Sequence, residues 1–133
     1  CDVVYSREPM EVTECEVADM LCRNRTRTAA IESNNGGRGF ARAVQRMAPT
    51  TKVEWFHQSG NKEARILSNS ATAIHLLRFP KGWQTRWRDL YAHLTTYRRT
   101  FNSNRWHDAA DVITGIVERE TKDSFRAKIS FAR

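Results

Sequence analysis

Strand-like and helix-like patterns of apolar residues follow one another in the first half of the chain. Thr28–Ser33 is a short run of small and apolar residues and Lys52–Gln58 alternates with period two, so both segments predict strands. Asn34–Gly37 predicts a tight glycine turn, and Arg38–Ala48 a helix that ends at Pro49. The residues that this helix is expected to bury are Phe40, Val44 and Met47.

Two further elements are predicted at the N-terminal end. Asp2–Tyr5 is typical of a short strand. Thr13 and Glu16 have the spacing of a capping box, although acidic residues begin at Glu11, so the helix start is open by one turn. The apolar stripe of this helix, which we expect to be buried, is Cys15, Val17, Met20, Leu21 and Cys22.

The second half of the chain is mainly helix-like. Helices are predicted at Asn61–Leu77, Trp83–Arg98 and His107–Lys122, with Ile74–Phe79 as an alternative strand and a loose tail after about Asp123. The apolar residues expected to be buried are Ala64, Leu67, Ala71, Ile74, Trp83, Trp87, Leu90, Tyr91, Leu94, Val112, Ile113 and Ile116. Strands that alternate with helices predict an α/β domain with a sheet that is at least partly parallel.

Charge and length narrow the class of protein. The chain has 133 residues, which is the length of one domain. Its 22 Lys and Arg residues exceed its 15 Asp and Glu residues, and six of those acids lie in the first 20 positions. Arginine outnumbers lysine 17 to 5, and guanidinium groups suit bidentate contacts with phosphate. The basic remainder indicates either a polyanionic partner or a solvated basic surface.

The sequence also bears on the cellular compartment. No window approaches the roughly 18 consecutive apolar residues of a membrane span, and the N-terminus lacks the order of a signal peptide. The three cysteines cannot all pair with one another. We therefore expect a soluble domain in the reducing cytosol.

Glu32 is the first candidate for chemistry, because it ends a predicted strand just before the glycine turn. Open α/β sheets bind their ligands outside the carboxyl ends of their strands. The alternative is structural: Glu32 accepts hydrogen bonds from the backbone amides of the turn, or pairs with an arginine.

Asp108 and Asp111 are the second candidate. Three residues apart on a helix, their carboxylates lie on one face. The alternative is an ordinary helix N-terminus, where acidic residues favour the helix dipole. Clustered carboxylates next to an arginine-rich surface suit a Mg²⁺ or Mn²⁺ nuclease, since hard cations take oxygen ligands.

Three motifs support this chemistry by resemblance. They are Ile31–Arg42 (IESNNGGRGFAR), Trp55–Gln58 with Asn61–Ile66, and His107–Asp111 with Thr114–Ile116. In this order they resemble the C-terminal nuclease domain of the large terminase subunits of tailed bacteriophages, over about residues 3 to 118. The resemblance implies an RNase H-like mixed sheet flanked by helices, two Mg²⁺ or Mn²⁺ ions, and cleavage of concatemeric phage DNA in the bacterial host cytoplasm.

The resemblance also implies roles for individual residues. Glu32 resembles the metal-binding acid at the strand end, Asp111 the catalytic acid on the last helix, and Asp108 its companion ligand. The family has another catalytic Asp on an earlier strand, and the chain begins after the position where that Asp is expected. We therefore expect an N-terminally truncated domain that lacks the first strands. No nucleotide-binding phosphate loop occurs in the sequence.

Basic residues are the candidates for DNA contact, and the residues assigned to this role are Arg38, Arg42, Arg46, Lys62 and Arg65. The first three recur every four residues on one helix face, and the alternative is a solvated face. Trp83, Trp87 and Tyr91 suit either base stacking or, more simply, a core. In the parent system the implied partners are double-stranded DNA, the terminase ATPase domain, the small subunit and the portal. The alternative function is a catalytically incomplete fragment that only binds DNA or the packaging machine.

Overall fold

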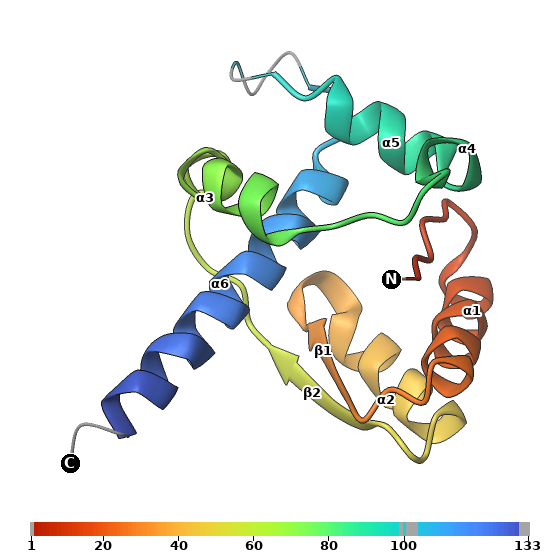
Figure 1. Ribbon diagram of the computed structural model, residues 1–133. Helices are drawn as coiled ribbons and strands as arrows, with labels where there is room; N and C mark the ends of the chain where they lie inside the picture. The colour runs from red at the N-terminus through yellow and green to blue at the C-terminus, as the bar shows by residue number, and fades with distance from the viewer. Residues whose placement is uncertain (1, 99, 101–103, 131–133) are drawn as a thin grey trace. The chain divides into compact units, whose positions relative to one another are not determined.

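The structure is a computed structural model that describes residues 2–98, 100 and 104–130. The chain forms two compact units, Cys1–Ser59 and Gly60–Arg133, which are described separately. About 59% of the chain is helical, and the sheet consists of two parallel strands (Figure 1). The expected α/β class is therefore confirmed in its coarse form.

The N-terminal unit contains the whole of the described sheet. Its elements in chain order are α1 (Met10–Arg23), β1 (Thr28–Glu32), the short 3-10 helix η1 (Asn34–Gly36), α2 (Gly37–Met47) and β2 (Lys52–Phe56). The strands pair in parallel from Thr28 opposite Lys52 to Glu32 opposite Phe56. Because parallel strands need a crossover, α2 provides the connection between them.

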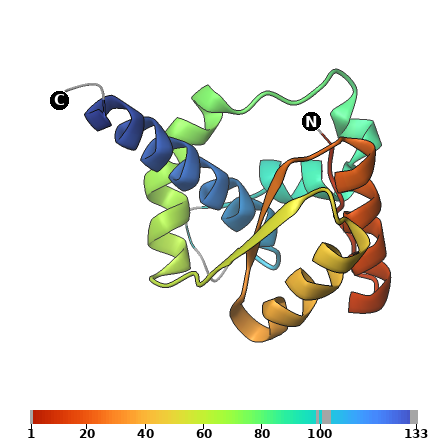
Figure 2. The same cartoon turned by 90° about the horizontal axis from the view of Figure 1, so that it is seen from below.

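One face of the two strands is covered by helix. Figure 2 shows α2 beside α1 and along the strands. The core between them consists of Ala18, Leu21, Val44 and Ala48, with Val17, Ala29, Ile31, Phe40 and Val53 partly buried against it. The small and apolar residues of Thr28–Ser33 predict a buried strand, and this prediction was wrong, because the cover is one-sided and the burial of β1 alternates.

Helix α2 is joined to both the turn and the second strand. Gly36, with φ of +93°, begins the helix in a left-handed conformation that suits glycine. At the other end, Gln45 Nε2 donates to the Thr51 carbonyl and Gln45 Oε1 accepts from the Val53 amide, both at 2.8 Å. These contacts hold the helix to the backbone where β2 begins.

The C-terminal unit is helical throughout its described elements. They are α3 (Lys62–Leu76), α4 (Trp83–Arg86), α5 (Arg88–Thr95) and α6 (Asp108–Ser130). Asn61 begins α3, since its side-chain oxygen accepts from the Ala64 amide at 3.1 Å. Helices α3 and α5 both contact α6, and the buried residues in the described part of the unit are Ile66, Leu90, Ala109, Thr114 and Val117.

Several predictions for the N-terminal segment were wrong. Asp2–Tyr5 forms no strand, and Asp2 instead pairs with Arg23 at the end of α1. Of the two helix starts left open, the earlier one is confirmed: α1 begins at Met10, so Thr13 does not cap a helix and its hydroxyl donates to backbone carbonyls one turn back. The expected core cysteines, Cys15 and Cys22, are exposed.

The predicted helices of the second half exist, but their boundaries and buried faces differ. Trp83–Arg98 is divided into α4 and α5 at Trp87, whose φ of −124° and ψ of 64° are not helical. Helix α6 continues through most of the expected loose tail, as far as Ser130. Residues that were expected to be buried are exposed on α2, α3, α5 and α6, namely Met47, Ala64, Leu67, Ala71, Ile74, Tyr91, Val112 and Ile116. No helix in the described part of the chain is long and apolar enough to cross a membrane.

Candidate carboxylate sites

Glu32 lies exposed at the carboxyl end of β1, where the backbone turns into α2. Asn34 Nδ2 donates to Glu32 Oε1 at 2.7 Å and to the Gln58 carbonyl at 2.8 Å. Ser33 donates to the Phe56 carbonyl through both its amide and its hydroxyl. The turn therefore ties the ends of both strands together and orients the Glu32 carboxylate through a side-chain amide.

Gly37 makes the tightest backbone contact at this turn. A Cβ built on Gly37 would lie 1.9 Å from the Glu32 carbonyl oxygen. Only glycine fits such an approach of one backbone to another. The first turn of α2 therefore lies directly against the end of β1, which places Glu32 next to the helix N-terminus.

Asp108 and Asp111 lie in the first turn of α6, as predicted, and face two cations from α3. Lys62 Nζ is 3.2 Å from Asp108 Oδ1 and 3.1 Å from Asp111 Oδ2. Arg65 Nη1 is 3.1 Å from the other oxygen of Asp111, Oδ1. The two carboxylate oxygens of Asp111 thus have different partners, and one ammonium group is shared between the two aspartates.

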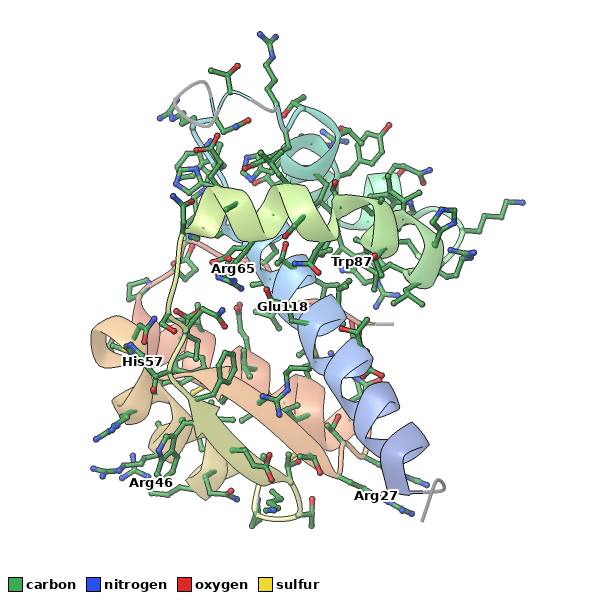
Figure 3. All side chains as sticks on the ribbon, turned by 90° about the vertical axis from the view of Figure 1, so that its left-hand side faces the viewer. Arg27, Arg46, His57, Arg65, Trp87 and Glu118 are labelled. Atoms are coloured by element: carbon green, nitrogen blue, oxygen red, sulfur yellow. The ribbon has the colours of Figure 1, made fainter. Side chains whose placement is uncertain are left out.

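Arg65 continues the network along α6. Its Nε and Nη2 atoms donate to the two oxygens of Glu118 at 3.2 and 3.3 Å, a bidentate contact (Figure 3). Asn69 Nδ2 reaches Glu118 Oε1 at 3.4 Å. A row of polar residues on α3 therefore faces a row of acids on α6.

Burial within this network is uneven. The side chains of Arg65 and Asp111 are 14% and 12% exposed, whereas Asp108 is 75% exposed. Partial burial lowers the pKa of Lys62, but the hydrogen bonds to Asp111 and Asp108 outweigh it, so the pKa lies above its ordinary value. Lys62 is therefore fully protonated and cationic near neutral pH.

The predicted basic residues fall into two groups. Arg38, Arg42 and Arg46 are exposed on α2, opposite its buried residues. Lys62 and Arg65 lie instead in the ion pairs with the acids of α6. The three arginines on α2 are exposed to solvent, where a phosphate can reach them. Lys62 and Arg65 are already in contact with carboxylates.

The aromatic stripe of the second half packs mostly on itself. Trp83 stacks on Phe79 with ring centroids 4.1 Å apart and meets the edge of Tyr91 at 5.1 Å. Trp87 lies under the guanidinium of Arg86 at 4.8 Å. These contacts favour packing over base stacking for the stripe.

Two contacts were missed by sequence reasoning. Asn34 lies two residues after Glu32, and nothing in the sequence distinguishes a side-chain amide that binds a carboxylate from an ordinary turn residue. Glu118 lies seven residues after Asp111 and so shares its helix face. That spacing signals a continuous acidic face, but it does not reveal the partner, Arg65.

The carboxylate oxygens of Asp108 and Asp111 are donors of the kind that a hard cation prefers, and one oxygen of each lies next to the same position. Both contributing atoms are carboxylate oxygens, and both lie about one hydrogen-bond length from the same positive atom. Within the described residues, no group of three or more His, Cys, Asp or Glu side chains is placed to hold a metal ion. The fit thus rests on the aspartate pair.

Comparison with known proteins gave no relative: no protein-family model, no curated protein and no solved structure matches the chain.

Proposed function

We propose that the chain is a metal-dependent DNA endonuclease domain of the terminase large-subunit type, which cuts concatemeric viral DNA. The observation that carries the proposal is the convergence of Asp108 Oδ1 and Asp111 Oδ2 on one cationic position, at 3.2 and 3.1 Å. Carboxylate oxygens that share a cation are the ligands that Mg²⁺ and Mn²⁺ prefer. As part of a terminase large subunit, the domain would have the terminase ATPase domain, the small subunit and the portal as partners. It would act in the cytoplasm of the bacterial host.

The N-terminal unit supports the same proposal. It has a parallel strand–helix–strand unit with an exposed acid, Glu32, at the carboxyl end of β1. This is where α/β sheets place their ligands. We infer that this unit is part of an RNase H-like sheet, in which further strands would accompany β1 and β2.

Each unit would supply its own residues to the chemistry. Glu32 in the N-terminal unit, and Asp108 with Asp111 in the C-terminal unit, would each offer ligands to divalent cations, which when bound activate water and stabilise charge on the leaving oxygen. Arg38, Arg42 and Arg46 would bind backbone phosphates through the open face of α2. Arg65, in contact with both Asp111 and Glu118, acts as a positioning residue for Asp111.

One observation favours a second function. Asp108, Asp111 and Glu118 all have counter-charges from α3. A network of this kind stabilises a helix pair without any metal, and the chain would then bind DNA or the packaging machine without cutting. Salt-sensitive DNA binding without cleavage at any Mg²⁺ or Mn²⁺ concentration is the expected behaviour of this alternative.

Plasmid nicking with Mn²⁺ tests the proposal. We expect nicking by the intact protein that contains this chain, and a loss of at least about 100-fold in its Glu32→Gln and Asp111→Asn variants, because losing a metal ligand costs more activity than losing a residue that only orients a ligand. Asp19→Asn is the matched control, since Asp19 is an exposed acid on α1. Its nicking rate should equal that of the wild type.

The outcomes separate the two functions. Circular dichroism of each variant shows whether its helices are retained, so that a loss of nicking reports on chemistry. If the wild type binds plasmid and never nicks it, the nuclease proposal fails and DNA binding alone remains. Nicking that survives in both carboxylate variants would equally exclude these residues as metal ligands.

A further inference from the structure

The two oxygens of Asp111 are used by two different cations. Oδ1 contacts Arg65 Nη1 at 3.1 Å, and Oδ2 contacts Lys62 Nζ at the same distance. Asp108 contributes one oxygen, Oδ1, to the same ammonium at 3.2 Å. Lys62 therefore occupies the one position on which oxygens from both aspartates converge.

Lys62 and Arg65 are held very differently. Arg65 donates three hydrogen bonds to two carboxylates through a rigid planar fork, and its side chain is 14% exposed. Lys62 is 34% exposed and carries its charge on a flexible four-carbon stem in the first turn of α3. Of the two cations, the Lys62 ammonium is therefore the more exposed and the less tightly held.

We propose that Lys62 is an internal counter-ion that holds the cation position between Asp108 and Asp111, and that a divalent cation binds there by displacing its ammonium. The inference rests on the metal binding of the proposed function and adds a regulatory element to it. The ammonium screens the repulsion between the two carboxylates between binding events. It also weakens metal binding, because the metal must replace contacts that already exist.

Removing the Lys62 charge should therefore tighten metal binding. Two partly exposed ion pairs together contribute about 1.4 kcal/mol, so their loss corresponds to a gain of about tenfold in affinity. Arg65 contacts the other oxygen of Asp111, Oδ1, so a substitution of Lys62 leaves that contact in place. The carboxylate thus stays oriented in the variant.

The test measures Mn²⁺ binding to the whole chain without DNA, from the loss of the free-ion signal in electron paramagnetic resonance. Lys62→Gln should bind Mn²⁺ about tenfold more tightly than the wild type, for the reason above. Lys62→Met, which keeps the apolar stem, serves as the second variant and should behave in the same way. Lys52→Gln is the matched control, because Lys52 also forms an ion pair, with Glu54 at 2.7 Å, and its removal changes the net charge equally.

Two results would overturn the inference. One is Mn²⁺ binding to Lys62→Gln and Lys62→Met that is no tighter than to the wild type. The other is a gain that persists when Asp108→Asn is added to Lys62→Gln, since the metal would then bind elsewhere. A gain of the same size in Lys52→Gln would show that the higher affinity follows from net charge alone, and this would also overturn the inference.

Failure of this inference is distinguishable from failure of the proposed function. Tighter Mn²⁺ binding in Lys62→Gln, without plasmid nicking by any version of the chain, would support the counter-ion and contradict the nuclease. Nicking that depends on Asp111, with no gain in Mn²⁺ affinity in Lys62→Gln, would support the nuclease and contradict the counter-ion.

Discussion

Asp2 lies beside the C-terminal end of α1, where its carboxylate accepts hydrogen bonds from Arg23 Nη2 at 2.7 Å and Asn24 Nδ2 at 3.0 Å. The bond from Arg23, followed by the bond from Asn24, lowers the pKa of Asp2 from 3.8 to about 2. A group whose pKa is lower in the folded state stabilises that state when it is ionised. The contribution of Asp2 is therefore complete above about pH 4 and is lost as the pH falls toward 2.

The prediction for this residue is a pH-dependent difference between Asp2→Asn and the wild type. At pH 7 the variant should unfold at a lower urea concentration, and the difference should shrink between pH 4 and pH 2 as Asp2 becomes protonated. Asp19→Asn controls for the loss of an exposed acid from the same unit. A difference that stays constant from pH 7 to pH 2 would show that the ion pair does not stabilise the fold.

The sequence predicted where the acidic residues lie better than it predicted which side chains contact them. The sequence predicted Glu32 at a strand end and Asp108 with Asp111 on one helix face, because both follow from the periods of strand and helix. The contact of Asn34 with Glu32 was not predictable, since it depends on the path of a turn. Cys15 was predicted to be buried because cysteine usually is, yet it lies exposed with its sulfur 3.9 Å from that of Met47.

Two glycines near the junction between β1 and α2 differ in the space that a methyl group would find. A methyl group at Gly37 would meet the Glu32 carbonyl, which is backbone and cannot rotate away, whereas nothing lies within 4 Å of a Cβ at Gly39. We expect Gly37→Ala to lower the free energy of unfolding by about 1–3 kcal/mol through overpacking. Gly39→Ala, inside the same helix, should raise it by about 0.5–1 kcal/mol.

Urea unfolding of both glycine variants checks this prediction, with Gly39→Ala as the matched control. A stabilised Gly37→Ala would mean that the strand end is free to move, and that the orientation of Glu32 does not depend on the close approach of α2.

The elements were predicted more reliably than their buried faces. Strand β1, helix α2 and strand β2 follow the sequence patterns closely, because period and turn residues are local signals. On α3 the apolar stripe was expected to be buried, but Ile74 is 76% exposed. The face that contacts α6 carries Lys62 and Arg65, because acids on α6 stabilise a polar contact that hydrophobic periodicity does not detect.

On the scale of the whole molecule, the excess positive charge predicts salt-dependent DNA binding. If Arg38, Arg42 and Arg46 each contact a phosphate, changing all three to Ala should reduce the slope of log affinity against log salt by about 2 to 3. A fluorescence titration of labelled duplex DNA between low and moderate salt gives this slope.

The control for this prediction removes equal charge elsewhere, from the exposed residues Arg25, Arg27 and Arg98. We expect a smaller change in slope from that variant than from the variant of α2. Equal changes in the two variants would show that the chain binds DNA through its overall charge and not through the face of α2.

Sequence reasoning treated the chain as one domain, and that assignment stays a prediction. The structure divides it into two compact units that meet in the chain at Ser59 and Gly60. Periodicity describes each element alone, so it carries no information on which elements form a common core. The parallel order of β1 and β2 was predictable because a helix separates them in the sequence.

Gln45 has a consequence for how this sequence can vary. Its amide group binds two main-chain atoms of the loop and strand that follow α2, the Thr51 carbonyl and the Val53 amide. Since every residue except proline offers both groups, side chains at the start of β2 can drift during evolution without releasing the helix. The anchor therefore depends on the side chain of Gln45 and not on that of Val53, which packs against the core.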